Sequence, residues 1–101
     1  MIGRVWHGWT KPENADAYEK LLKTAGLPTF HRFAGYRHAY VMRMPKEHET
    51  EFLVVTFWDS MDAVRSFAGA DGKGAVILPG ARELLARWDE TSLHYDAARV
   101  D

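Results

Sequence analysis

Cysteine is absent from this 101-residue chain, and its absence removes several classes of function. Without thiols there is no disulfide framework, thiolate nucleophile, iron–sulfur ligation or thiolate zinc site. An excess of one charge is missing too, because 13 basic and 14 acidic residues are interleaved and give a net charge of −1. Since no basic stripe is available to neutralise a phosphate backbone, we expect no nucleic-acid partner.

Long apolar runs are also missing. No apolar stretch approaches the ~20 residues needed to span a bilayer, and the opening segment MIGRVWHGWTKPEN lacks the apolar core of a signal peptide. We therefore expect no membrane partner and a cytoplasmic location. The hydrophobic fraction of 47% is ample for folding, and the length supports a single domain over residues 1–101.

The stretch from Glu51 to Gly69 is the clearest structural signal in the chain. Residues 52–58 form a β-branched and aromatic run, which is typical of a central strand covered on both faces. Asp59 and Ser60 then offer side-chain oxygens that can cap a helix, and the apolar residues up to Ala68 share one helical face. Gly69 is placed to end that helix.

Periodicity predicts the remaining elements. Alternating side chains indicate strands over residues 2–10, 36–44 and 91–97. Helical spacing indicates a first helix over about residues 12–25 and a third over about residues 79–88. The start and end signals of the first helix are a Thr10–Glu13 capping box and the helix breakers Gly26 and Pro28.

This order of elements, β-α-β-β-α-(α)-β, predicts an α+β fold of the ferredoxin-like, split βαβ type. Such a fold has a four-stranded antiparallel sheet with its helices on one face. The other face would then expose large apolar side chains, and the second strand offers Tyr36, His38, Tyr40 and Met42 for it. Because a wide apolar patch usually marks an interface, we expect a face-to-face homodimer.

The segments FWDSMDAVRSFAG and GAVILPGARELLARWDETSLHYDA, with RVWHGWT at the start of the chain, resemble the antibiotic biosynthesis monooxygenase-like family. The resemblance covers nearly the whole chain. It implies a dimeric α+β barrel, in which each protomer has a pocket between its sheet and its helices. The family includes cofactor-independent oxygenases that act on aromatic polyketides, haem-degrading oxygenases and members of unassigned function.

The haem-degrading branch of the family is disfavoured by individual residues. Its members pair a first-strand Asn with a Trp at the end of the third strand and a haem-ligating His about ten residues later. Here Trp58 matches the Trp, but the first-strand position holds His7, and FAGADGKGAV contains no His. We therefore expect no cofactor, and no histidine pair has the spacing of a recognisable metal motif.

Two histidines are candidates for a catalytic base. His7 lies on the strand face that we expect to look toward the helices and the pocket, and His94 lies in the last strand within LHYD. A neutral imidazole at either place would deprotonate a phenol or an activated methylene near neutral pH. For both residues, ordinary packing in a strand is the simpler interpretation.

The residues expected to bind an aromatic or polyketide-like substrate are mostly aromatic, since aromatic walls suit a flat ligand. They are Trp9, Trp58, Phe67 and His38. The leading hypothesis is a cofactor-independent, monooxygenase-like homodimer. The alternative is a non-catalytic homodimer that binds a small ligand or serves as an accessory protein, and the size and lining of the pocket distinguish the two.

Overall fold

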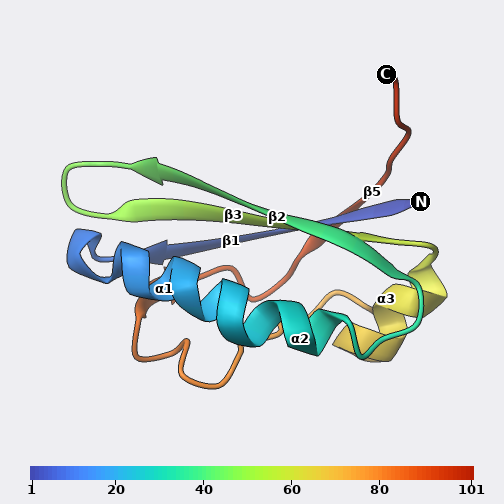
Figure 1. The fold of residues 1–101 in the computed structure, drawn as a ribbon, viewed down its shortest axis with the longest axis horizontal. Coiled ribbons are helices and arrows are strands. Elements are labelled where there is room, and N and C mark those ends of the chain that lie inside the picture. The colour runs from blue at the N-terminus through green and yellow to red at the C-terminus, as the bar shows by residue number, and fades with distance from the viewer.

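The computed structural model describes all 101 residues, whose strands form one antiparallel sheet with the helices on one side of it (Figure 1). This confirms the α+β, ferredoxin-like fold. No helix combines the length and the apolar character that a membrane crossing requires. In chain order the elements are β1 (Ile2–Thr10), η1 (Pro12–Asn14), α1 (Ala15–Leu21), η2 (Leu22–Gly26), α2 (Leu27–Phe30), β2 (Tyr36–Pro45), β3 (Thr50–Trp58), α3 (Met61–Ala68), β4 (Leu85–Trp88) and β5 (Leu93–Asp96).

The sheet is built around β1. Its order is β2-β3-β1-β4, and β5 also pairs with β1. β3 pairs with β1 over its whole length, from Ile2 opposite Trp58 to Thr10 opposite Thr50. Along its other edge, β4 pairs with the end of β1 and β5 with its beginning. The strand expected over residues 91–97 is therefore present as β5, and β4 is an additional strand on the same edge of β1.

The prediction of a helix over residues 79–88 is wrong. A single turn forms instead, closed by the N–H of Leu84 and the N–H of Leu85, which both donate to the carbonyl of Ala81. The chain then enters β4, where Leu85 pairs with Thr10. Ala81 and Leu85 are buried, so the apolar spacing reflects packing against the core. The open edge of β1 supplies backbone partners that a longer helix would forgo.

The first helix is longer than the sequence predicts. It runs as one helical segment from η1 through α2, so Gly26 and Pro28 do not end it. A π-helical turn, η2, comes directly before Pro28, and the N–H of Leu27 donates to the carbonyl of Leu22. Because proline has no N–H to donate, the wider turn lets the helix continue past it.

The predicted capping box at the start of this helix is also absent. Lys11 occupies the N-cap position and makes no side-chain capping bond. Thr10 is instead the last residue of β1, fully buried, and its Oγ1 has no hydrogen-bond partner. The strand therefore extends to the residue that the spacing assigned to the cap.

The strand and helix of residues 50–69 follow the predicted ranges closely, but the helices cover only one face of β3 and not both as predicted. Ser60 caps α3, since its Oγ accepts a 3.2 Å hydrogen bond from the N–H of Ala63. Gly69 ends the helix with a φ of +101°, a conformation that glycine adopts without steric cost. Val64 is the fully buried residue of α3 and anchors the helix in the core.

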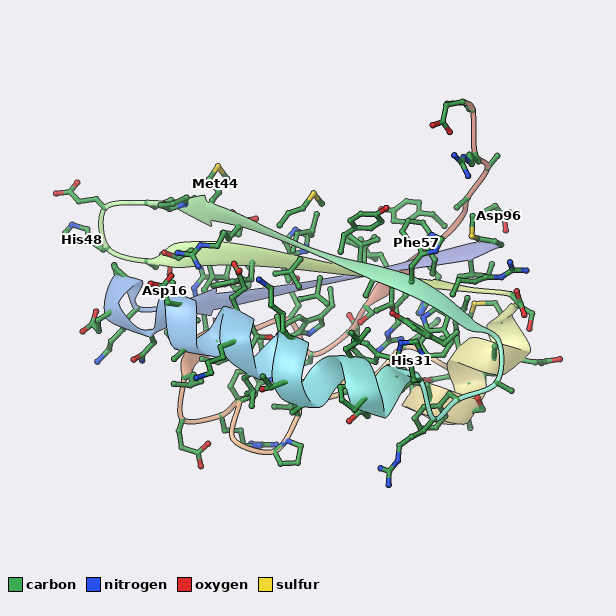
Figure 2. The ribbon with its side chains drawn as sticks, viewed as in Figure 1. Asp16, His31, Met44, His48, Phe57 and Asp96 are labelled. Carbon is green, nitrogen blue, oxygen red and sulfur yellow. The ribbon has the colours of Figure 1, made fainter.

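The two faces of the sheet differ in cover. Alternate residues of β3, including Phe52 and Trp58, are buried beneath the helices. The opposite face carries no helix, and Figure 2 shows Met44 projecting from that side. A register shift between Tyr36 and His38 turns Tyr36 toward the helices, so the prediction that it shares the open face is wrong. The remaining three predicted residues, His38, Tyr40 and Met42, lie on the open face and are exposed.

Candidate functional site

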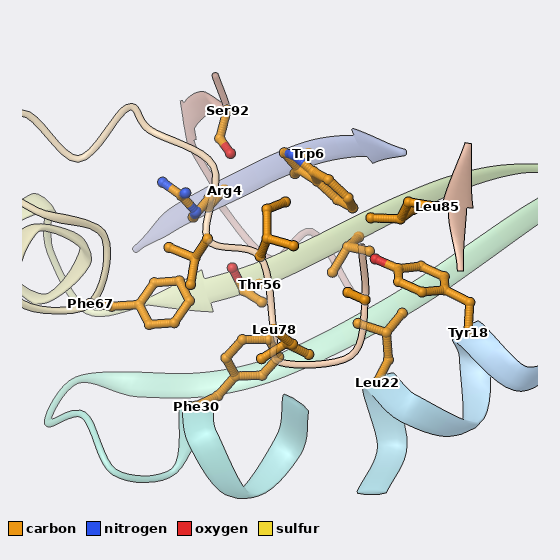
Figure 3. A pocket seen from close by; sticks show the side chains of 14 residues that line it. Arg4, Trp6, Tyr18, Leu22, Phe30, Thr56, Phe67, Leu78, Leu85 and Ser92 are labelled. Atoms are coloured by element: carbon orange, nitrogen blue, oxygen red, sulfur yellow. The ribbon is translucent and has the colours of Figure 1, made fainter. Parts of the chain in front are cut away.

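A cavity of about 40 Å³ lies between the sheet and the helical layer (Figure 3). Of the 14 residues that line it, 11 are hydrophobic, and four are aromatic: Trp6, Tyr18, Phe30 and Phe67. Figure 3 shows Arg4 and Ser92 toward one end and Tyr18 and Leu85 toward the other. The cavity therefore has a polar end and an aromatic, apolar body, a combination typical of small-molecule sites.

The wall that Trp6 provides depends on a glycine. Gly8 lies two residues further along the same face of β1, and the Trp6 indole lies over it. A Cβ on Gly8 would come within 2.6 Å of Trp6 Cη2, closer than real carbon atoms approach. The indole N–H also donates a 2.8 Å hydrogen bond to the carbonyl of Asp89. Trp6 is thus held in place by its packing over Gly8 and by its hydrogen bond to Asp89.

Arg4 is the charged residue of the site. It is only 4% exposed, and it donates from Nη1 to the carbonyl of Gly72 and from Nη2 to the carbonyl of Gly74, at 2.6 Å for the latter. Its guanidinium also lies 5.7 Å from the centre of the Phe67 ring. Burial lowers the pKa of Arg4 to about 10, so the side chain stays charged at neutral pH.

His94 lies next to Arg4, at the margin of the cavity. Its Nε2 is 3.0 Å from Arg4 Nη1, and because a guanidinium can only donate, Nε2 accepts and the ring proton sits on Nδ1. Burial lowers the pKa of His94, and the positive charges of Arg4 and Lys73 lower it further. The imidazole is therefore neutral at pH 7, as a general base must be.

Two hydroxyl groups complete the polar lining. Ser92 is 5% exposed, and its Oγ is buried with no hydrogen-bond partner. Thr56 Oγ1 accepts a 2.9 Å hydrogen bond from the indole N–H of Trp58. At the other end, burial raises the pKa of Tyr18 above its ordinary range, so its phenol remains protonated. Ser92 is thus the polar group of the lining whose bonding capacity is unused.

The segment between α3 and β4 covers one side of the cavity. It contributes Val76, Ile77, Leu78 and Ala81 to the lining and contains no helix or strand. Leu78 and Ala81 are buried, whereas Val76 is 38% exposed. A connection of this length without regular structure is uncommon in a compact domain, and its outward movement would enlarge the cavity of about 40 Å³ toward the roughly 150 Å³ of a cavity that binds benzene.

Three of the site residues expected from the sequence lie on the open face of the sheet. The expectation that His7 looks toward the helices is wrong: it pairs with Leu53 on the open face, while Trp6 lines the cavity. His7 lies 3.7 Å from Glu51 and 3.8 Å from Asp89, as ring nitrogen to carboxylate oxygen. The other two residues are Trp9 and His38.

The other three expected residues lie on the helix side. Phe67 lines the cavity. Trp58 is fully buried and stacks on Phe67, with ring centres 5.1 Å apart, so it supports the wall without lining it. His94 touches the cavity only through Arg4. No cluster of three or more potential metal ligands is present.

Arg4 and Ser92 were not singled out from the sequence as site residues. For Arg4 a signal existed, because a charged residue inside an otherwise apolar strand falls on the same face as Ile2 and Trp6. Ser92 carries no comparable signal, since a serine near a turn is unremarkable. Only the burial of its unpartnered Oγ in the structure marks Ser92 as a site residue.

Comparison with known proteins agrees with this architecture. Residues 1–75 match the family model of the antibiotic biosynthesis monooxygenase domain. Among solved structures, a crystal structure of a candidate antibiotic biosynthesis monooxygenase from Bacillus cereus matches with a TM-score of 0.68, covering 99% of this chain and 97% of that one. At 10% identity this likeness shows the fold alone. No curated protein matches the sequence. The chain belongs to the antibiotic biosynthesis monooxygenase family.

Proposed function

We propose that this protein is a homodimeric, monooxygenase-like protein that binds a small aromatic molecule between its sheet and its helices. The observation that carries the proposal is the cavity itself, which is lined by four aromatic rings and is polar at one end. Offset and edge-on contacts with Trp6, Tyr18, Phe30 and Phe67 favour a flat aromatic ligand over an aliphatic one. The family membership supports the same class of function.

In this proposal His94 is the general base. It is the candidate histidine on the helix side, and it is neutral at pH 7. An activated methylene would lose a proton to Nε2 once Arg4 turns toward the ligand, and the carbanion would pass one electron to dioxygen. Combination of the two radicals and loss of water give a carbonyl, so that R₂CH₂ and O₂ yield R₂C=O and H₂O without a cofactor.

The open face of the sheet is the proposed dimer interface. Tyr40, Met42, Met44, Leu93 and Tyr95 are each at least half exposed there. A contiguous apolar surface of this kind is rare on a monomer, and a second copy of the same face would cover it. His7, Trp9 and His38 would then lie inside the interface, separated by the sheet from the ligand proposed for the cavity.

A non-catalytic, ligand-binding homodimer is the second candidate. The observation that favours it is that no histidine lines the cavity, whose volume of about 40 Å³ must grow before a ring can enter. In this alternative His94 only positions Arg4. A cytoplasmic location remains a prediction under both candidates.

Oxygen consumption with a tricyclic aromatic ketone that has an activated methylene, such as anthrone, tests the enzymatic candidate. We expect one O₂ consumed per carbonyl formed, and a loss of about 10²-fold in rate for His94→Ala. His48→Ala, the same change in an exposed loop, should leave the rate unchanged. Ligand binding without oxygen uptake would establish the second candidate.

Binding itself is tested by filling the cavity. Ala81 is 2% exposed and lines the cavity, so Ala81→Leu should occupy the space and weaken binding of the neutral probe 2-naphthamide at least about tenfold. Ala17→Leu, on the exposed side of α1, is the matched control. Equal weakening by both variants would contradict the assignment of this cavity.

A further inference from the structure

Arg4 differs from the other arginines in one respect. Five of them, Arg37, Arg43, Arg65, Arg87 and Arg99, have a carboxylate within 4.0 Å. Arg32 and Arg82 have none but are exposed, so water solvates their charge. Arg4 is both buried and without a carboxylate. A buried cation that lacks an anionic partner is costly, and its presence calls for an explanation.

The carbonyl groups around Arg4 satisfy only part of its bonding capacity. A guanidinium has five N–H donors, and those to Gly72, Gly74 and His94 use three of them. Two donors and the whole positive charge remain. Arg4 lines the cavity together with Ser92, whose buried Oγ has no partner.

We infer that the ligand of this cavity carries an anionic oxygen, as an aromatic carboxylate or phenolate does, and that Arg4 and Ser92 bind this oxygen. The inference rests on the proposed function, because it names the chemical class of the ligand at the same site. Arg4 supplies the charge and a planar set of donors, and Ser92 supplies a hydroxyl donor. The aromatic rings at the other end hold the apolar body of the ligand.

A competing explanation is that Arg4 is only a clamp for the segment after α3. Its bonds to the carbonyls of Gly72 and Gly74 tie that segment to β1. A clamp explains the hydrogen bonds, but neutral donors would serve as well and would not bury a charge. The two roles are separable, because only the anion site discriminates between a charged ligand and its neutral isostere.

The experiment compares 2-naphthoate with 2-naphthamide, which share the ring and differ in charge. Calorimetric titration of the full chain at pH 7 should give at least about tenfold tighter binding of the naphthoate. Arg4→Met should bring the ratio of the two affinities close to one, and Ser92→Ala should reduce it in part. Arg32→Met, an exposed arginine without a carboxylate partner, should leave the ratio unchanged.

The outcomes separate the inference from the function on which it rests. If neither probe binds, the proposed aromatic site is wrong. If both bind equally well, the aromatic site stands and the anion inference fails. A preference for naphthoate that survives Arg4→Met would place the anion elsewhere. Should Arg4→Met fail to fold, the Nε–H resonance of Arg4 in the unaltered protein decides, since it must shift with naphthoate and not with naphthamide.

Discussion

The two faces of the β-sheet depart from ordinary burial in opposite ways. On the helix side, the strands bury polar groups among apolar ones, including Arg4, Thr56 and Ser92 around the cavity. On the open side, the strands expose large apolar groups such as Tyr40 and Met42. Buried polarity and exposed apolarity are the two departures from ordinary burial that carry information. The first points to a ligand and the second to a protein partner.

Charge on the two faces follows the same division. The open face balances its charges locally, since Glu51 has Lys46 at 3.0 Å and Arg87 has Glu49 at 2.8 Å. The helix face leaves Arg4 without a carboxylate. These charges of the open face therefore have partners within one chain, whereas the partner inferred for Arg4 is the anionic oxygen of a ligand.

Removing an aromatic anchor from each face tests the difference in burial most strongly. Trp58 is fully buried on the helix side, so Trp58→Ala should lower the free energy of unfolding by about 3–5 kcal/mol. Within a single chain Trp9 is only partly buried on the open face, so Trp9→Ala should cost less than half as much at a protein concentration low enough to keep the chain monomeric. Urea titration followed by circular dichroism measures both values. Equal losses would mean that the two faces are buried alike.

A charge placed at the centre of the open face tests the partner. Val55 lies between Val5 on β1 and Tyr40 on β2, so Val55→Glu puts a carboxylate in the middle of the proposed interface. We expect the mass measured by light scattering at micromolar concentration to fall from that of a dimer to that of a single chain, because a desolvated, unpaired charge opposes association. Val100→Glu, at a residue that is 98% exposed, is the matched control. A monomeric mass for the unaltered protein would overturn the interface.

The sequence specified these faces well where the signals are local. Residues 52–58 form a β-branched and aromatic run, and Ser60 and Gly69 mark the ends of α3 through hydrogen bonding and backbone geometry that involve neighbouring residues alone. Such features depend on no distant contact, so a single sequence is enough to predict them.

The sequence failed where distant pairing decides. Residues 85–88 have helical spacing, but the free edge of β1 draws them into β4. The side of the sheet on which His7 lies depends on which face the helices cover, and alternation alone is symmetric between the two. The shifted register at Tyr36 adds one residue to β2 and moves that side chain across the sheet. The cavity also depends on distant contacts, because residues from both ends of the chain line it.

The smallest effect we predict sharpens the electrostatic side of the comparison. Because burial lowers the pKa of His94 in the folded protein, the unfolded chain binds a proton first as the pH falls below about 6.5. The contribution of His94 to stability is thus fully present above that pH and is lost as the pH falls toward the folded pKa. His94→Asn should flatten the decline in the free energy of unfolding between pH 7 and 5, whereas His48→Asn, in the exposed loop between β2 and β3, should leave it intact.

If naphthoate binds Arg4, its negative charge offsets one of the two positive charges that hold the pKa of His94 down. With naphthoate bound, the free energy of unfolding should therefore fall less between pH 7 and 5, whereas naphthamide should leave that fall unchanged. Urea titrations at each pH would resolve the difference.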